Sequence, residues 1–465
     1  MSAAATGSRH RRGSSRTRWP TSCQAQRAAH ELDIDEIRAR FPALERRVGG
    51  RTVAYFDGPG GSQAPRAVID AVAGYLERSN ANAGGAFASS RETDELLAAA
   101  HGAAADLVGA KPGEIAFGAN MTTLNFLLSH AVARTCAPGD EIVVTQLDHD
   151  ANVSPWFRAA EDRDLVVRVA PIRAGDGTLD HDALEALIGE RTRVVAFTLA
   201  SNALGNVPDA RRLAAAAHRV GALAWADGVH LAPHRRIDRD ALGLDVVLCS
   251  PYKFFGPHLG LAAIRSELAE RLPADRVRAA SSEPPGHRFE AGTLNHEALA
   301  GTVAAIDYLA GLASGGGGGT DADEGAEPDT HGSRRRARLD SAYEAIRVHE
   351  ESLAGRFLEQ IPAISGLRLH GLADPGAVAE RTPTFLIEIE GHPPREVAAA
   401  LGRRGMFAWD GDFYAPAPLR LLGLGPEGGV RIGFLHYNAA AEVDALLEAL
   451  AEIAAGRDAE LAVAG

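Results

Sequence analysis

The sequence predicts an α/β fold, in which a mostly parallel sheet flanked by helices forms a large domain and a smaller α+β domain follows. Runs of nearly continuous apolar residues alternate with helix-like stretches along the chain. This alternation is typical of parallel strands that are buried on both faces. The composition, 46% hydrophobic and 23% charged, is that of a globular protein. No apolar run reaches the ~18 residues that a membrane-spanning helix needs.

The N-terminal region divides into a tail and a first structured segment. Residues 1–30 contain six arginines and no acidic residue, and we expect a disordered basic tail there. The stretch ELDIDEIRARFPAL, which starts at Glu31, predicts a short amphipathic helix. We expect the segment 31–56 to pack with the small domain.

We expect the large, cofactor-binding domain over residues 57–313. Its strands are predicted at 113–118, 140–145, 165–170, 193–200, 222–227 and 245–250. Its helices are predicted at 122–134, 182–190, 209–220 and 296–313. Strands that alternate with helices in this way favour a parallel sheet.

A glycine-rich, acidic stretch of low complexity predicts a disordered insertion over 314–335. The small α+β domain is expected over 336–465. Its elements are predicted as helices at 336–361, 395–404 and 440–455, and as strands at 383–391 and 429–437.

Charge and cysteine content exclude several classes of protein. The formal net charge is −13, so neither nucleic acid nor an anionic membrane is expected as the main partner. The three cysteines, Cys23, Cys136 and Cys249, are too few and too odd in number for a disulfide framework. Such sparse cysteine fits a reducing compartment, which predicts a cytoplasmic location.

Polar side chains gather where five consecutive predicted strands end. Ligands of open α/β sheets bind beyond the carboxyl ends of the strands. The polar groups lie at 120–123, 147–152, 201–205, 227–230 and 250–253. One such residue alone is more often a cap or a turn residue, but five strand ends together favour a ligand site.

Lysine is scarce, since only Lys111 and Lys253 occur among 48 basic residues. Arginine stays protonated, whereas a lysine amine forms Schiff bases. Lys111 lies in a predicted turn, where a lysine is normally just solvated. Lys253 follows a strand end and is therefore the candidate for covalent chemistry.

These groups match the needs of pyridoxal 5'-phosphate (PLP). Lys253 supplies the amine for a Schiff base and is the expected base at the substrate α-carbon. Asp227 supplies a carboxylate for the ring nitrogen. Asn202 is predicted to donate to the phenolate oxygen, and His149 to stack on the ring and assist proton transfer.

The phosphate of PLP needs a cup of N–H groups, which a helix N-terminus offers. Met121 and Thr122 open the predicted helix after the first strand, and Ser250 adds a hydroxyl. These three residues complete the predicted cofactor site.

Several motifs stand at or near these positions: Asn202, Asp227-Gly-Val-His230, Ser250-x-x-Lys253, Arg288-Phe-Glu-Ala-Gly-Thr293 and Tyr55-Phe-Asp-Gly-Pro-Gly-Gly61. Together they resemble the class V aminotransferase family, in its cysteine desulfurase-like branch. The resemblance implies PLP fold type I and a homodimer with the active site at the subunit interface. It further implies that His230 contacts the cofactor, that Thr293 reaches the phosphate of the partner subunit's cofactor, and that Arg431 binds the substrate carboxylate.

The sequence departs from the desulfurase pattern at three places. The stretch 405–415, where desulfurases carry a nucleophilic cysteine, contains none. His230 and Tyr252 stand where desulfurases usually have glutamine and histidine. We therefore predict a PLP-dependent enzyme acting on an amino acid by β-elimination or C–S bond cleavage, without a protein persulfide. The alternatives are a transaminase or epimerase of the same family, or a non-catalytic PLP-fold binding protein.

Other motif matches lack their structural context. Ser250-Pro-Tyr-Lys253 fits the S-x-x-K motif of serine β-lactamases, but neither lysine lies in a K-T-G element. The G-x-G-x-x-G match at 423–428 precedes a strand instead of a helix. The histidines and aspartates at 148–150, 230 and 234 match no tight metal-ligand spacing, so no metal is predicted.

Overall fold

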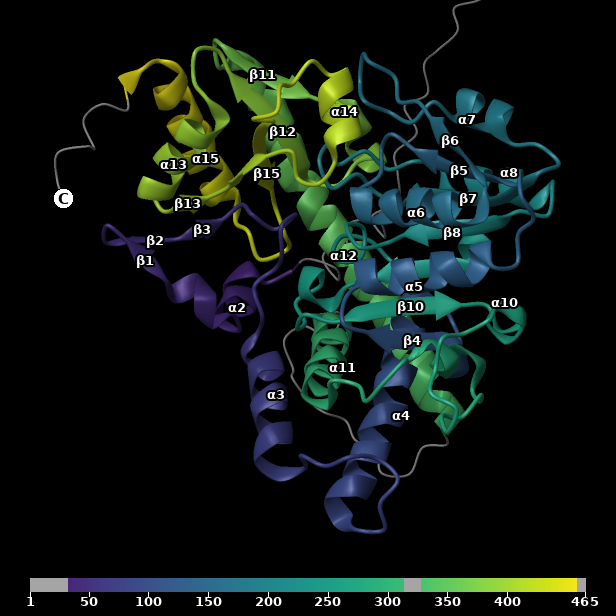
Figure 1. Ribbon diagram of the computed structural model, residues 1–465. Helices are drawn as coiled ribbons and strands as arrows, with labels where there is room; N and C mark the ends of the chain where they lie inside the picture. The colour runs from purple at the N-terminus through teal and green to yellow at the C-terminus, as the bar shows by residue number, and fades with distance from the viewer. Residues whose placement is uncertain (1–31, 313–327, 458–465) are drawn as a thin grey trace, which may run out of the picture.

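The structure is a computed structural model that describes residues 32–312 and 328–457. The predicted basic tail and most of the predicted insertion lie outside these residues. A large sheet and a smaller one, each covered by helices, form the body of the protein (Figure 1). In the described ranges no helix combines the length and the apolar character needed to cross a membrane.

The large sheet has seven strands in the order β4-β10-β9-β8-β7-β5-β6. Their bounds are β4 (Ile115–Gly118), β5 (Glu141–Thr145), β6 (Val166–Ala170), β7 (Thr192–Thr198), β8 (Leu223–Asp227), β9 (Val246–Cys249) and β10 (Gly260–Ile264). Strand β10 runs antiparallel to β4 and β9, and the other neighbours pair in parallel. The predicted α/β fold with a mostly parallel sheet is therefore confirmed, and β10 is an addition to it.

Helices cover both faces of the large sheet. They are α3 (Arg66–Arg78), α4 (Ala88–Val108), α5 (Met121–Ala133), α6 (Ser154–Arg163), α7 (His181–Leu187), α8 (Ala210–His218), α9 (Arg239–Leu242), α10 (Ser266–Arg271) and α11 (His296–Gly311). Successive side chains of a strand point to opposite faces. On β7, Val195 and Phe197 join the core with α4, α8 and α11, whereas Val194 and Ala196 join the core with α5 and α6.

The small sheet is antiparallel, with the strand order β11-β12-β15-β14. Its strands are β11 (Leu367–His370), β12 (Thr384–Ile389), β14 (Trp409–Gly411) and β15 (Gly429–Gly433), and its helices are α12 (Pro328–Gln360), α13 (Pro394–Arg403), α14 (Pro416–Leu421) and α15 (Ala440–Ala454). Helix α12 begins at Pro328, so the predicted helix start at 336 is too late and the predicted insertion too long. Strand β15 ends at Gly433, before the predicted end at 437.

The N-terminal segment lies against the small sheet. It contains α2 (Ile34–Ala39), β1 (Arg47–Val48), β2 (Arg51–Thr52) and β3 (Ala54–Tyr55), and β3 pairs in parallel with β13 (Met406–Phe407). Arg38 donates to the carbonyl oxygen of Tyr437 (2.8 Å) and forms an ion pair with Glu442 (2.9 Å). The turn that follows β3 is thereby carried to the boundary between the two sheets.

Gly260, the first residue of β10, lies directly against the cap of α5. A Cβ atom there would lie 2.3 Å from the carbonyl carbon of Asn120, so the backbone would have to move. We expect Gly260→Ala to lower the free energy of unfolding by about 1–3 kcal/mol, as overpacking does, in a denaturant titration. The control is Gly102→Ala within α4, where a Cβ meets nothing within 4 Å; it should stabilise the protein by about 0.5–1 kcal/mol. Equal effects of the two substitutions would contradict the close approach.

Candidate active site

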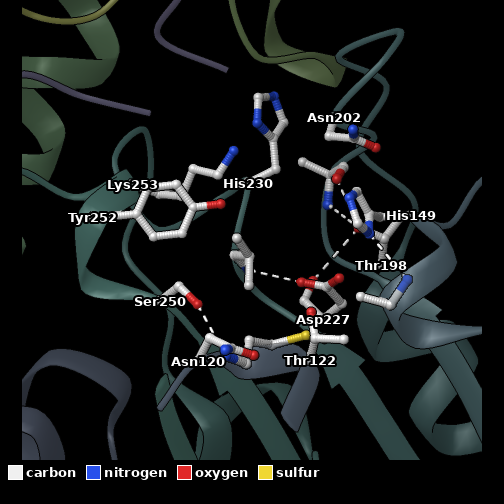
Figure 2. A pocket seen from close by; sticks show the side chains of 14 residues that line it. Asn120, Thr122, His149, Thr198, Asn202, Asp227, His230, Ser250, Tyr252 and Lys253 are labelled. Atoms are coloured by element: carbon white, nitrogen blue, oxygen red, sulfur yellow. Dashed lines mark hydrogen bonds between the residues drawn. The ribbon is translucent and has the colours of Figure 1, made fainter. Parts of the chain in front are cut away.

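A cavity of about 530 Å³, including its open mouth, lies beyond the carboxyl ends of β7, β8 and β9 (Figure 2). It is lined by Asn120, Met121, Thr122, His149, Ala151, Thr198, Ala200, Asn202, Asp227, Val229, His230, Ser250, Tyr252 and Lys253. Every residue that the strand ends predicted for the cofactor is therefore in one place. The two residues predicted from resemblance alone to bind phosphate and carboxylate, Thr293 and Arg431, are not in the lining.

The N-terminus of α5 forms one end of the cavity. Asn120 caps this helix, because its Oδ1 accepts a hydrogen bond from the backbone N–H of Thr123 (2.8 Å). The N–H of Met121 donates to Ser250 Oγ (3.2 Å), which ties the helix start to the end of β9. Among the first N–H groups of α5, that of Thr122 has no acceptor among the described residues. This N–H group and the helix dipole favour an anion beside the helix start.

Asp227, the last residue of β8, is buried under the cavity floor. Its Oδ1 accepts a hydrogen bond from the N–H of Val229 (2.9 Å). Burial raises the pKa of Asp227 to about 6, although the charge of Lys253 opposes this shift. A buried carboxylate is stabilised by a positive charge or a proton donor beside it, and a protonated ring nitrogen supplies one.

Lys253 ends the short 3-10 helix η4 (Pro251–Lys253), which follows β9. Its ammonium donates to the carbonyl oxygen of Pro59, in the turn after β3. Burial, assisted by the charge of Arg431, lowers the pKa of Lys253 to about 7. The amine is therefore partly neutral near neutral pH, which is the form that attacks a carbonyl carbon.

Arg431 of β15 does not line the cavity, but it contacts Asn202, which does. Its Nη1 donates to the carbonyl oxygen of Asn202 (3.0 Å), and its Cζ lies 4.3 Å from the centre of the Phe413 ring. Burial lowers the pKa of Arg431 to about 9. The side chain of Asn202 donates from Nδ2 to the carbonyl oxygen of Phe413 (2.9 Å), so large and small domains meet at this point.

The loop that carries Phe413 is held in an unusual backbone conformation. Phe413 and Tyr414 have φ angles of 57° and 54°, in the left-handed region that side chains other than glycine rarely adopt. The carbonyl oxygen of Tyr414 accepts a hydrogen bond from the N–H of Asp150 (2.7 Å). Hydrogen bonds from Asn202 and Asp150 therefore fix the two strained residues against the cavity.

His149 follows β5 and lies beside Tyr414, with the ring centres 5.6 Å apart. Burial lowers the pKa of His149 to about 4, and the charges of Lys253 and Arg431 act in the same direction. The ring is thus neutral at neutral pH. Its Nδ1 accepts a hydrogen bond from the N–H of Ala151 (3.0 Å), so the proton lies on Nε2.

Some residues of the cavity region were not predicted. Thr198 ends β7 and Tyr252 directly precedes Lys253. Both lie at strand ends, so the rule that ligands bind beyond the carboxyl ends of strands could have identified them. Tyr252 stacks on His258, with ring centres 4.8 Å apart and an interplanar angle of 7°.

Asp57, which follows β3, was not predicted either. Burial raises the pKa of Asp57 to about 6, although the charges of Arg431 and Lys253 act to lower it. Thr293 is exposed and lies away from the cavity lining.

The cysteines of the described residues lie outside the cavity lining. Cys249 is buried on β9, and burial raises the pKa of its thiol well above the ordinary value. Cys136 follows α5 and is partly buried, and burial raises its thiol pKa as well. Both thiols are therefore poor nucleophiles at neutral pH. Cys23 lies outside the described residues.

The residues present fit PLP. Within the described residues, the amide oxygen of Asn202 and Nε of Arg431 are buried without a hydrogen-bond partner. The carboxylate of Asp227 is buried without a paired cation at hydrogen-bond distance. Buried polar groups are normally satisfied, so these three groups point to a polar ligand with a cationic ring nitrogen and an anionic end.

Comparisons with known proteins agree with this site. Residues 54–314 match the model of the family described as Aminotransferase class-V. A cysteine desulfurase of Synechococcus elongatus is 30% identical over 91% of this chain and 64% of its own, and an uncharacterized protein of Mycobacterium tuberculosis is 31% identical over 90% of this chain and 99% of its own. The solved apo structure of a cysteine desulfurase from Thermococcus onnurineus superposes with a TM-score of 0.79 at 24% identity, over 92% of this chain and 99% of that one.

The similarities differ in the share of each protein that they cover and in what they show. The chain spans 60–67% of the length of three curated cysteine desulfurases that it matches. The similarity to the Thermococcus structure concerns the fold, which is PLP fold type I. The family match covers more than half of the chain, including the strand ends that carry Lys253 and Asp227. The chain belongs to the class V aminotransferase family, with cysteine desulfurases among its relatives, and its cofactor is PLP.

Proposed function

We propose that this protein is a PLP-dependent enzyme that acts on an amino acid and cleaves a bond at its β-carbon, a C–S bond included, without storing sulfur on a protein cysteine. One observation carries the proposal. Lys253 and Asp227 line one cavity, and the charge of Lys253 is affected by Asp227 and by the buried Arg431, which donates a hydrogen bond to the cavity residue Asn202. Lys253 would supply the reacting amine, Asp227 would pair with the cofactor ring, and Arg431 would bind the substrate carboxylate.

The cofactor, when bound, withdraws electrons from the α-carbon of an amino acid joined to it. Asp227 would hold the ring nitrogen in its protonated form. The carboxylate and the protonated nitrogen have opposite charges, so each lowers the free-energy cost of burying the other. The first turn of α5 and the hydroxyl of Ser250 would hold the phosphate. His149, neutral and fixed by Ala151, would lie against the ring.

Lys253 would move the proton of the α-carbon. A base works best when its pKa is near the working pH, and the pKa of about 7 meets this condition. The carbonyl oxygen of Pro59 accepts from the amine in the free protein. This bond keeps the amine inside the cavity in the cofactor-free protein.

Arg431 would bind the substrate carboxylate. Its Nε has no partner among the described residues, and the ring of Phe413 covers one face of the guanidinium. A carboxylate would compensate the buried charge that lowers the pKa of Arg431. The carboxylate end of the substrate would then be fixed relative to Lys253.

The fate of the leaving group separates this proposal from a persulfide mechanism. No cysteine lies in the stretch 405–415, and Cys249 is buried beside Gly228, whose Cβ would lie 3.1 Å from its Sγ. In a β-elimination, sulfur would leave as sulfide while the amino acid ends as pyruvate and ammonia. In a transfer to an outside thiol, sulfur would end as the persulfide of that thiol and the amino acid, which gains a proton at its β-carbon, as alanine. A panel of amino acids, assayed for sulfide, pyruvate and ammonia, tests the proposal. Transfer of the amino group or inversion at the α-carbon without these products would favour the transaminase or the epimerase instead.

We also propose a homodimer, in which Thr293 contacts the phosphate bound by the partner subunit. The exposure of Thr293 outside the cavity of its own chain supports this role. A cytoplasmic location stays a prediction from the cysteine content.

Borohydride reduction of the PLP-loaded protein should label Lys253 and leave Lys111 unlabelled in a peptide map. Lys111 is the control, since it is exposed and lies before the strand β4. Capture of PLP by the cofactor-free protein should accelerate as the pH rises through about 7, because the lowered pKa makes the neutral amine abundant above that pH. Label on Lys111 would show that the site is wrong.

Asp227→Asn should keep PLP bound but slow turnover by at least about tenfold, since each unit of pKa shift at the ring nitrogen corresponds to about 1.4 kcal/mol. Absorbance reports the bound cofactor and product release reports turnover. Asp162→Asn, on the exposed end of α6, is the matched control. Full activity of Asp227→Asn would remove the proposed role of the carboxylate.

The combined replacement Cys23→Ser, Cys136→Ser and Cys249→Ala should retain most of the cleavage activity, because none of these thiols serves the proposed reaction. Mass spectrometry of the wild type after turnover should detect no added sulfur. A stoichiometric persulfide on Cys249, with activity lost in Cys249→Ala alone, would instead establish a relocated nucleophile.

A further inference from the structure

A cluster of three potential metal ligands lies outside the candidate active site. It consists of His101 of α4, His287 of the short 3-10 helix η5 (Pro285–Phe289) and Glu290, which follows η5. The ligand atoms of these side chains all lie within 4.8 Å of one another, and residues 32–312 and 328–457 contain no second cluster of this kind. None of the three residues lines the cavity at the strand ends. The cluster is therefore separate from the predicted PLP site.

The fold holds η5 against the edge strand β4. A Cβ atom on Gly286 would lie 2.6 Å from the carbonyl oxygen of Ile115, so the two elements are in direct contact. The N–H of Phe117, on β4, donates to Glu290 Oε1 (2.9 Å). His101 reaches the same place from α4, and its ring centre lies 5.0 Å from that of Phe117. The three ligands thus come from elements that already pack together.

The contacts of His101 restrict what lies between it and Glu290. Its Nδ1 lies 2.7 Å from the carbonyl oxygen of Leu97. A carbonyl oxygen only accepts, so Nδ1 carries a proton. Its Nε2 lies 2.9 Å from Glu290 Oε1, and a lone pair on Nε2 would repel the carboxylate at this distance. Either a proton or a metal ion therefore lies between the two side chains.

His287 favours a metal ion over a proton at this place. Its ring centre lies 3.9 Å from that of His101, at an interplanar angle of 38°. Its Nε2 is buried without a hydrogen-bond partner among the described residues, although buried polar atoms are normally satisfied. A proton between His101 and Glu290 leaves the His287 nitrogen unsatisfied. A metal ion would bind both imidazoles and the carboxylate.

The donor set selects zinc. Two histidines, one glutamate and a water molecule are ligands that bind zinc in tetrahedral geometry. A histidine that binds a metal commonly donates its other N–H to a carbonyl group, as His101 does to Leu97. Tetrahedral ligands at ~2.0–2.2 Å from the ion lie about 3.3–3.6 Å from each other. Rotation of the partly exposed His287 side chain would close the cluster on the ion.

We propose that His101, His287 and Glu290 form a zinc site that joins α4 to η5. Zinc would take the place of the proton between His101 and Glu290, and this proton would go to solvent. The ion would fix the start of the segment that leads to Thr293. The sequence gave no local sign of the site, because His101 and Glu290 are 189 residues apart.

Zinc binding to the full-length, PLP-loaded protein tests the site in the absence of any amino acid. After equilibration with micromolar zinc, we expect one retained zinc ion per chain at this site. X-ray absorption should show nitrogen and oxygen ligands at about 2.0–2.2 Å. Sulfur ligands would place the ion on a cysteine. Sulfur ligands, or binding only at millimolar zinc, would overturn the proposal.

His287→Asn distinguishes a metal ligand from a structural residue. The buried nitrogen of His287 has no hydrogen-bond partner, so the melting temperature of the zinc-free protein should change little. Zinc affinity should fall at least about 10- to 100-fold, the loss that follows even the removal of a residue that only supports a ligand. Zinc should raise the melting temperature of the wild type and not that of the variant.

A second variant and a matched control complete the test. Glu290→Gln keeps an acceptor for the N–H of Phe117 and should weaken zinc binding as His287→Asn does. The control is His218→Asn, in an exposed pair with Asp245 (2.8 Å) that has no third ligand among the described residues. It should leave zinc binding unchanged. Unaltered zinc binding in both site variants, or an equal loss in the control, would overturn the proposal.

Discussion

The buried guanidinium of Arg381 joins the two sheets where the loop after β7 meets the start of β12. It donates to the carbonyl oxygens of Leu204 (3.1 Å) and Thr384, and lies 4.3 Å from the centre of the Phe385 ring. Burial lowers the pKa of Arg381 to about 9, a cost that the carbonyl acceptors offset. Asn202 lies in the loop that is held in this way. The loop that carries Asn202 is therefore held by a contact between the two domains.

The sequence alone predicts the strands that are buried on both faces, because such strands consist almost entirely of apolar residues. The strands β5, β7, β8 and β9 are covered on both faces, and their apolar runs made them predictable. Strand β10 was missed because its run of small residues, 260–264, has no alternation and no β-branched side chain before its last position. Helices α3 and α4 were missed although α3 has a local signal, an amphipathic pattern that begins after Pro65; their packing against α11 is remote in sequence.

The site was predictable up to the reach of one rule, that ligands bind where parallel strands end. This rule alone predicts that Lys253, Asp227 and Asn202 lie in one site. Arg431 came from resemblance, since a strand arginine of the small domain carries no local sign of its partner. Asp57 lies in the run 55–61 that contributes to the resemblance, but it was given no role there, because its position depends on the pairing of β3 with β13 across some 350 residues of chain. What the sequence leaves open are the contacts made between distant segments.

The pair Phe413 and Tyr414 has a consequence for ligand affinity. Each residue in the left-handed region holds roughly 1–3 kcal/mol of conformational energy, and the hydrogen bonds from Asn202 and Asp150 keep that energy in the loop. A ligand that binds the unpartnered Oδ1 of Asn202, or the second hydrogen of its Nδ2, leaves both restraints in place. The conformational cost of the loop is therefore already met in the ligand-free protein, and a ligand held by Asn202 meets a loop that is already in position.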